Sequence, residues 1–249
     1  VEELKVKFKN IRKEFLTKGG YSPIEFVTGR TKKIASIVSK AKRLNIQDIE
    51  AEMEDIAGIR IMCQFVEDIY NIVNLIKSRS DMSIVYEKDY IKNFKDSGYR
   101  SYHVIIKYPI HSIAGSKEIL CEIQIRTLAM NFWATIEHSL KYKYEHYIPE
   151  NLAVRLRRAA DAAFLLDQEM SEIREDIMKA QVMYQVKSVT LRDVLDKIQE
   201  LYNVGETHKA IKYQRRLDKV DDERDITEIL QLKNEIDLLL QEYKNKVDD

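Results

Sequence analysis

The sequence has few of the features that mark secreted or membrane-embedded proteins. Only two cysteines occur in 249 residues, which argues against a disulfide framework. There is no run of about 18 apolar residues, and no positively charged segment followed by a short apolar one, so neither a membrane span nor a signal peptide is expected. We therefore expect a cytoplasmic protein in which Cys63 and Cys121 are reduced and buried.

A net charge is also absent, because 41 basic residues balance 41 acidic ones. The chain as a whole has no field that would draw it to nucleic acid or to an anionic membrane, so any polyanion site must be a local basic cluster. With 45% hydrophobic residues, the chain is long enough for one sizeable core, or for a core domain with a helical appendage.

Proline and glycine are scarce and unevenly distributed. All three prolines and six of the seven glycines lie in the first 149 residues, and only Gly205 interrupts the remainder. The two parts are therefore built differently. From residue 151 onward, apolar residues repeat at helical spacing, which predicts helices to the end. Residues 201–220 faintly resemble one tetratricopeptide unit, although a single copy cannot bury its own face.

The first part of the chain predicts strands and helices in alternation. Helices are expected at about residues 4–15, 31–44 and 68–77, and from Thr127, as a capping residue, to before Pro149. Strands are expected at residues 58–66, 82–90, 101–108 and 118–126. This order indicates an α+β fold, a mixed sheet flanked by helices, with an all-helical C-terminal extension.

Two of the predicted helices carry a basic face. In the helix over residues 31–44, we expect the apolar face to point inward: Ile34, Ile37, Val38, Ala41 and Leu44. The other face presents Lys32, Ser36, Lys40 and Arg43. The N-terminal helix presents Lys5, Lys9 and Arg12, with only Glu2 at pairing distance.

Polar side chains share one face of the last predicted strand. Strict alternation buries Cys121, Ile123 and Ile125 and leaves Glu122, Gln124 and Arg126 together on the other side. The same alternation exposes Arg60 and Gln64 on the strand that follows Asp55, and it places Tyr99, Ser101 and His103 on one side after Gly98. Two acids, several cations and an exposed aromatic ring are what magnesium-dependent phosphoryl transfer needs.

Taken singly, each of these residues is better explained by an ordinary structural role. Asp55 suits a helix cap, Glu122 a cross-strand ion pair, and Tyr99 a packed turn aromatic. His103 is typical of a histidine in a strand whose ring nitrogens are hydrogen-bonded within the fold, and the lysines are typical of solvent-exposed helix faces. The functional interpretation therefore depends on the combination.

Four short segments, in this order, resemble the synthetase region of RelA/SpoT homologues. They are FVTGR at residues 26–30, DIAGIR at 55–60, GYRSYH at 98–103 and EIQIRT at 122–127. The run over residues 126–140, with NFWA at 131–134, is similar in particular to the RelQ type of small alarmone synthetase. The resemblance implies a catalytic domain over residues 1–150 and its C-terminal helix over 151–185. Residues 186–249 depart from it and form a helical extension of unknown role.

The resemblance also implies an activity. Such enzymes transfer pyrophosphate from ATP to the 3′-hydroxyl of GDP or GTP and release AMP, using Mg²⁺, a nucleotidyltransferase-like sheet and a homotetrameric assembly. Asp55 and Glu122 match the catalytic metal ligands, and Glu122 would also draw the proton from the acceptor hydroxyl. No hydrolase activity is expected, because none of the five histidines is followed by aspartate and no segment precedes the synthetase motifs.

The remaining site residues follow from the same resemblance. Arg30 and Arg60 would sandwich the adenine of ATP, and Tyr99 would stack on guanine. The other residues of the ATP site would be Lys32, Ser36, Lys40, Arg43 and Glu137. The other residues of the acceptor site would be Lys95, His103, Gln124 and Asn131. The pentaphosphate product would activate the enzyme at a second site made of Lys5, Lys9, Arg12, Glu25, Phe26 and Thr28.

Other functions stay open at this point. A catalytically silent nucleotide or RNA sensor would have the same fold, although the presence of both Asp55 and Glu122 argues against it. RelQ relatives also bind single-stranded RNA, which would suit the basic N-terminal helix. A different nucleotidyltransferase, such as a polymerase, would need two carboxylates close together on one strand, and the strands in question have no such pair. The acceptor stays open among GDP, GTP and GMP.

Overall fold

The computed structural model describes residues 1–113, 115–143, 149–220 and 226–247. The chain divides into two compact units, Val1–Glu172 and Ile173–Asp249. The division falls inside the long helix α6 (Glu150–Asn203), whereas the sequence predicted the extension to begin at residue 186. Among the helices of the described ranges, none is both long enough and apolar enough to cross a lipid bilayer.

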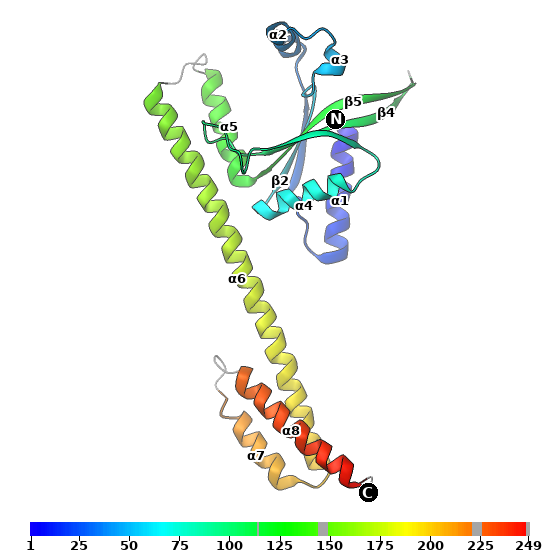
Figure 1. Ribbon diagram of the computed structural model, residues 1–249, viewed down its shortest axis with the longest axis vertical. Helices are drawn as coiled ribbons and strands as arrows, with labels where there is room; N and C mark the ends of the chain where they lie inside the picture. The colour runs from blue at the N-terminus through cyan, green and yellow to red at the C-terminus, as the bar shows by residue number, and fades with distance from the viewer. Residues whose placement is uncertain (114, 144–148, 221–225, 248–249) are drawn as a thin grey trace. The chain divides into compact units, whose positions relative to one another are not determined.

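The first unit is built on a five-stranded sheet with the strand order β1-β2-β5-β4-β3 (Figure 1). The strands are β1 (Phe26–Thr31), β2 (Ala57–Cys63), β3 (Ser83–Asp89), β4 (Tyr102–Ser112) and β5 (Gly115–Thr127). Strands β2 and β5 are parallel, and the other neighbours are antiparallel. The predicted mixed sheet is confirmed, with one additional strand, β1, at its edge.

Helices α1 (Glu2–Gly19) and α4 (Val66–Lys77) pack against one face of this sheet (Figure 1). Their apolar residues share a core with the buried residues of β2 and β5, as predicted from alternation: Leu4, Phe8, Ile69, Ile72, Ile59, Ile61, Ile123 and Ile125. The opposite face of β2 and β5 carries the polar side chains of Arg60, Glu122, Gln124 and Arg126, together with the buried Met62.

Both cysteines are free and fully buried in the central strands, in agreement with the sequence. Cys63 ends β2, and Cys121 lies in β5, directly opposite Ala57 of β2. Burial raises the pKa of both thiols, that of Cys121 to about 12. Neither thiol is therefore ionised at neutral pH.

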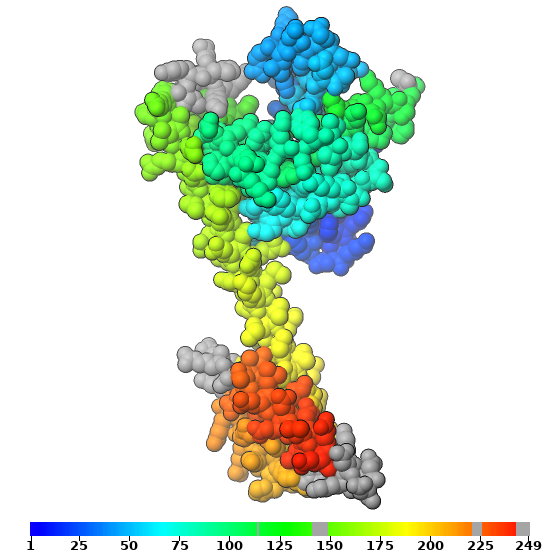
Figure 2. Space-filling model, in the orientation of Figure 1, coloured from blue at the N-terminus to red at the C-terminus, as the bar shows by residue number. Residues whose placement is uncertain are grey.

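The apolar face of α2 (Ile34–Leu44) does not enter the core, so that expectation was wrong. Ile34 is 80% exposed and Leu44 is 55% exposed, and only Ala41 is buried. Helix α2 forms a protrusion in the space-filling view, together with the short α3 (Ile49–Glu52), which contacts β5 through the ion pair of Glu50 with Lys117 (Figure 2). Amphipathic spacing identifies the two faces of a helix, but it does not say what covers them.

Thr127 joins β5 to two helices. Its hydroxyl accepts from the backbone N–H of Met130 at 3.1 Å and so caps α5 (Leu128–Lys143), as predicted. The same hydroxyl donates to the carboxylate of Asp167 in α6 at 2.6 Å. Burial raises the pKa of Asp167 to about 6, Glu67 acts in the same direction, and the bond from Thr127 opposes them.

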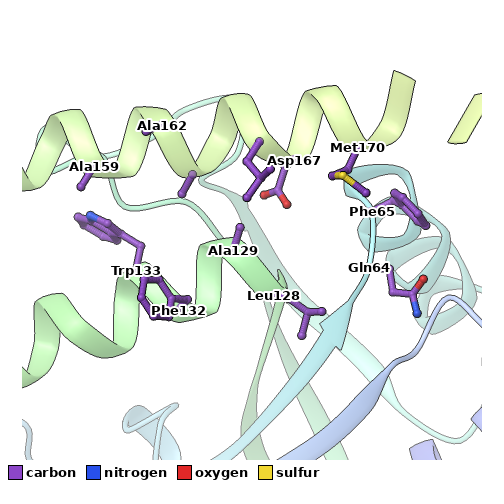
Figure 3. Close-up of a pocket in the computed structure, with 12 residues that line it drawn as sticks. Gln64, Phe65, Leu128, Ala129, Phe132, Trp133, Ala159, Ala162, Asp167 and Met170 are labelled. Atoms are coloured by element: carbon purple, nitrogen blue, oxygen red, sulfur yellow. The ribbon is translucent and has the colours of Figure 1, made fainter. Parts of the chain in front are cut away.

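An open, largely apolar groove of about 780 Å³ lies between α5 and residues 159–170 of α6 (Figure 3). Phe132 and Trp133 line it from α5, and Asp167 and Met170 line it from α6. The indole N–H of Trp133 donates to the carbonyl of Leu156 at 2.8 Å, which ties the two helices together. None of the residues that line this groove belongs to the predicted nucleotide site.

The second unit is helical, as predicted, and has its own core. It contains the end of α6, α7 (Thr207–Leu217) and α8 (Ile226–Val247). Its buried residues are Val194, Ile198, Leu201, Ala210, Tyr213, Leu217, Ile229, Leu232, Ile236 and Leu240. The turn between α6 and α7 holds Gly205 at φ 88°, where a side chain would be strained. Helix α8 supplies the apolar partner that a single helical hairpin lacks.

We predict that Asp167→Asn raises the thermal midpoint, and does so more at pH 8 than at pH 5. A carboxyl group whose pKa is raised on folding, here from 3.8 to about 6, stabilises the fold at low pH, and this contribution is lost as the pH rises through about 6. The amide stays neutral, and its oxygen still accepts from Thr127. We expect a gain of about 2 °C or more at pH 8, measured by differential scanning calorimetry. An equal gain at both pH values would contradict the raised pKa.

Candidate active site

The strand register gathers polar side chains on the sheet face opposite α1 and α4. Gln124 of β5 lies between Arg60 of β2 and His103 of β4. Glu122 lies two residues before Gln124 and opposite Gly58 of β2. Because side chains alternate along a strand, these four polar groups project from the same face. Glu122 and Gln124 therefore share one face of β5, as alternation predicted.

Glu122 is held in place by donors on both of its oxygens. Its Oε1 lies 2.9 Å from Nδ1 of His103, and its Oε2 accepts from Nε2 of Gln124 at 2.8 Å. Burial by itself raises the pKa of Glu122, and the charge of Asp55 does the same. The contacts with His103 and Gln124 outweigh both and lower the pKa below its usual value. Glu122 is therefore an ionised, oriented carboxylate that can accept a proton.

Asp55 lies between two lysines, of which Lys32 precedes α2 and Lys40 belongs to it. Its carboxylate oxygens are 2.6 Å from Nζ of Lys32 and 2.9 Å from Nζ of Lys40. Burial raises the pKa of Asp55, but the two ammonium groups lower it further than burial raises it. The structure thus brings together a predicted metal ligand and two predicted phosphate-binding lysines.

Two rings surround Tyr99, the predicted guanine-stacking residue. Tyr90, Tyr99 and His103 meet edge to face, with centroid distances of 5.1 to 6.1 Å. The hydroxyl of Tyr99 is hydrogen-bonded to Nε2 of His103 at 2.8 Å. The ammonium group of Lys95 lies 5.1 Å from the centre of the Tyr99 ring and 4.8 Å from that of Tyr90. Sequence reasoning did not identify Tyr90, whose role depends on the pairing of its N–H with the carbonyl of Ser101.

The two arginines predicted to hold adenine project from neighbouring strands. Arg30 of β1 lies opposite Gly58, and Arg60 lies opposite Thr28, so both share the polar face. Arg30 is exposed and Arg60 is partly buried. Burial, Arg126 and Arg30 all lower the pKa of Arg60, which shows how closely the cations are gathered.

The other predicted residues of the nucleotide site lie on two helices. Ser36 and Arg43 are exposed on α2. Asn131 and Glu137 are partly buried on α5, which directly follows β5. These four residues are therefore carried by the helices that flank the Asp55 and Glu122 clusters.

The residues predicted for the second site lie on both sides of β1. Lys5 of α1 packs over Gly29, so α1 covers the face of β1 to which Gly29 and Val27 belong. Phe26 and Thr28 are exposed on the opposite face. These residues therefore lie on both faces of the edge strand β1.

Three of the residues predicted for the second site already have partners. Lys5 pairs with Glu2 at 2.9 Å, the acid predicted for it. Arg12 donates from Nε to the carbonyl of Ile24 at 3.0 Å, and Glu25 accepts from Gln64 at 2.7 Å. Lys9 is exposed. The basic face of α1 is thus partly used to hold the segment that leads into β1.

The acids of the site suit magnesium better than zinc. Within the described ranges, no cluster of three or more His, Cys, Asp or Glu residues is arranged to hold a metal ion. Asp55 and Glu122 are close enough for the charge of one to raise the pKa of the other. Two carboxylates fit Mg²⁺, which completes its coordination with water and phosphate oxygens, whereas zinc sites use three or four protein ligands.

The sequence is similar to known proteins over most of its length. Residues 29–147 match the family described as the region found in RelA/SpoT proteins. GTP pyrophosphokinase YjbM of Bacillus subtilis is 55% identical over 188 residues, which cover 75% of this chain and 89% of that protein. GTP pyrophosphokinase YwaC of the same organism is 40% identical, over 71% of this chain and 86% of that protein.

The fold is similar to those of solved structures. Small alarmone synthetase 1 from Bacillus subtilis, bound to its product pppGpp, superposes with a TM-score of 0.68 and 56% identity over 71% of this chain and 92% of that one. The AMPCPP-bound form of the same synthetase gives a TM-score of 0.63 and 52% identity over 72% of this chain and 92% of that one. About a quarter of the present chain lies outside each of these matches.

Proposed function

Because the chain belongs to the RelA/SpoT family, we propose that it is a small alarmone synthetase, which transfers pyrophosphate from ATP to the 3′-hydroxyl of GDP or GTP and releases AMP. The observation that carries this proposal is the joint placement of an ionised Glu122 and a lysine-paired Asp55 at one site. The names of the similar proteins, GTP pyrophosphokinases and small alarmone synthetases, support it.

In the proposed reaction, the 3′-oxygen of the acceptor attacks the β-phosphorus of ATP. A bond from that oxygen to the β-phosphorus forms, the bond between the β-phosphorus and the bridging oxygen of AMP breaks, and Glu122 takes the proton of the hydroxyl. Since His103 and Gln124 fix both oxygens of Glu122, the base needs no reorientation. The work of the protein is alignment, neutralisation of charge and removal of one proton.

On the donor side, Lys32 and Lys40 are assigned to the ATP phosphates. Asp55 and Glu122 are assigned to Mg²⁺, which when bound would neutralise the charge that develops on the transferred group. In the free chain the two lysines are paired with Asp55, so they are held near the place where the phosphates would arrive. The remaining donor-side residues are Arg30, Arg60, Ser36, Arg43 and Glu137.

On the acceptor side, we assign guanine to the ring of Tyr99. The amphipathic surroundings of that ring suit a nucleoside, because aromatic contact holds a base while polar groups reach its sugar and phosphates. The other acceptor residues are Lys95, His103, Gln124 and Asn131. Since the substrates are cytoplasmic metabolites, we place the reaction in the cytoplasm.

The proposal is tested by incubating the chain with ATP, MgCl₂ and, in separate reactions, GDP, GTP or GMP. Anion-exchange chromatography should resolve AMP and a guanosine product that carries two additional phosphates, in equal amounts. The relative rates name the preferred acceptor. Nucleotide binding without AMP release would instead identify the chain as a sensor and would overturn the proposal.

We predict that Asp55→Asn and Glu122→Gln each lower turnover by about a hundredfold or more, because each removes a charge while changing little volume. Initial rates of AMP formation measure the loss, and circular dichroism confirms that each variant is folded. Glu118→Gln is the matched control, since Glu118 is an exposed carboxylate near the start of the same strand. Parental rates in either folded site variant would contradict the assignment.

Tyr99→Ala should raise the KM for the acceptor and leave the KM for ATP unchanged. Stacking on a base contributes about 1 to 3 kcal/mol, which corresponds to an increase of about 5- to 150-fold. Tyr99→Phe keeps the ring but loses the hydroxyl, so it should raise the acceptor KM less than Tyr99→Ala does. Initial rates with one substrate varied at a time measure both constants. Equal increases for both substrates would show that Tyr99 only packs the loop.

Activation by the pentaphosphate product is part of the same proposal, together with assembly as a homotetramer. Lys5, Lys9 and Arg12 give α1 a cationic face, and Phe26 and Thr28 lie just before Arg30 of the adenine site. The cations of α1 and the pair of Phe26 and Thr28 lie on opposite sides of the edge strand β1, so a second subunit would complete the enclosure of a ligand there. A ligand that ordered β1 would hold Arg30 in position before ATP binds.

We predict that added pentaphosphate lowers the substrate concentration at half-saturation, or raises the initial rate, by about 5- to 150-fold, which is a typical allosteric coupling. Lys9→Ala should abolish this response. Lys9 is chosen because Arg12 also holds the carbonyl of Ile24. Lys18→Ala, an exposed position on the other side of α1, is the control. Initial rates with and without pentaphosphate measure the effect. An unresponsive parent, or a fully responsive Lys9→Ala, would show that the basic face is merely solvated or binds single-stranded RNA.

A further inference from the structure

Arg126 is a buried cation inside the site that has no assigned role so far. Its side chain, only 5% exposed, projects from β5 on the same face as Gln124 and Glu122. Its Nε donates to Oγ of Ser101 at 3.2 Å. Its Nη2 donates to Oε1 of Gln124 at 2.8 Å and to the hydroxyl of Tyr99. One guanidinium group therefore contacts two of the proposed acceptor residues.

The first of these contacts leads to one oxygen of Glu122. The amide of Gln124 accepts from Arg126 at Oε1 and donates from Nε2 to Oε2 of Glu122 at 2.8 Å. A guanidinium group only donates, so it fixes which end of the amide faces it and leaves the N–H end for the carboxylate. Arg60 adds a longer bond of 3.3 Å to the same amide oxygen.

The second contact leads to the other oxygen of Glu122. The oxygen of Tyr99 accepts from Arg126, and its hydroxyl is bonded to Nε2 of His103 at 2.8 Å. Nδ1 of the same ring lies 2.9 Å from Oε1 of Glu122. Because an ionised carboxylate only accepts, a neutral imidazole here carries its proton on Nδ1 and accepts from Tyr99 at Nε2. All the donors then point from Arg126 towards Glu122.

A purely stabilising role does not account for this residue. Among the described residues, no carboxylate forms a salt bridge with Arg126, whose hydrogen-bond partners are a serine, an amide and a phenol. A second guanidinium group, that of Arg60, is close enough for the charge of Arg126 to lower its pKa. Burying a cation beside another cation and among neutral acceptors costs free energy. The position of Arg126 is better explained by what it orients.

We propose that Arg126 is the positioning residue of the acceptor half of the site. It holds the amide of Gln124 and the ring of Tyr99 in the orientations that present both to the acceptor nucleotide and that direct two donors at Glu122. Arg126 acts through these groups and does not touch the substrate. The inference rests on the proposed synthetase function and extends it to a residue for which the family motifs gave no role.

The test is steady-state kinetics of Arg126→Gln and Arg126→Lys. Arg126→Gln should raise the acceptor KM about tenfold or more and lower kcat by a similar factor, while the KM for ATP stays within about twofold of the parent. Arg126→Lys keeps the charge but cannot reach all three partners in the same geometry, so it should give intermediate values. Arg100→Gln is the control, because Arg100 is equally buried but is directed at Asp161 of α6. It should lower the thermal midpoint without changing the ratio of the two KM values.

A double-mutant cycle separates positioning from simple structural damage. If Arg126 acts through the hydroxyl of Tyr99, then Arg126→Gln should lower kcat/KM for the acceptor less in a Tyr99→Phe background than in the parent. The inference would be overturned if Arg126→Gln lowered kcat/KM by the same factor in both backgrounds. It would also be overturned if Arg126→Gln raised the KM values for the acceptor and for ATP equally. Arg126→Lys is tested by the same criteria if Arg126→Gln does not fold. If these variants had the kinetics of the parent, only the role of Arg126 would be refuted. An inactive parent would refute the synthetase function itself.

Discussion

The parallel pairing of β2 with β5 is the constraint on which the site depends. It sets Gln124 opposite Arg60 and Glu122 opposite Gly58. A shift of one residue would turn the polar side chains of β5 into the core and its apolar ones towards solvent. The burial of Cys121, Ile123 and Ile125 therefore fixes the positions of the reactive groups as firmly as it fixes the core. Hydrophobic packing on one face of the sheet determines the chemistry on the other.

Both carboxylates of the site are compensated before any nucleotide is present. Asp55 is neutralised by Lys32 and Lys40, and Glu122 is stabilised by donors from His103 and Gln124. In both cases these contacts offset the unfavourable burial of a carboxylate and keep it ionised. A magnesium nucleotide brings one cation and several anionic oxygens. It can therefore exchange partners with these groups without leaving a buried charge uncompensated.

The sequence predicted those features that depend on the order and alternation of residues along one segment. The shared face of Glu122 and Gln124 and the cap at Thr127 are of this kind. Strand β1 was missed because an edge strand with Gly29 near its centre and alternate residues exposed has no continuous apolar run. The inward face expected for α2 was wrong because no neighbour covers Ile34. The contacts of Tyr90 and Arg126 join segments far apart in the chain, which periodicity does not reveal.

The two buried thiols lie on the same pair of central strands, and neither supplies the thiolate that alkylating reagents attack. A folded molecule therefore does not react with a maleimide, because both sulfurs lie in the core that α1 and α4 cover. Labelling thus proceeds only as fast as this core opens. The rate of labelling of the two native cysteines therefore reports how often the core opens, and no additional probe has to be introduced.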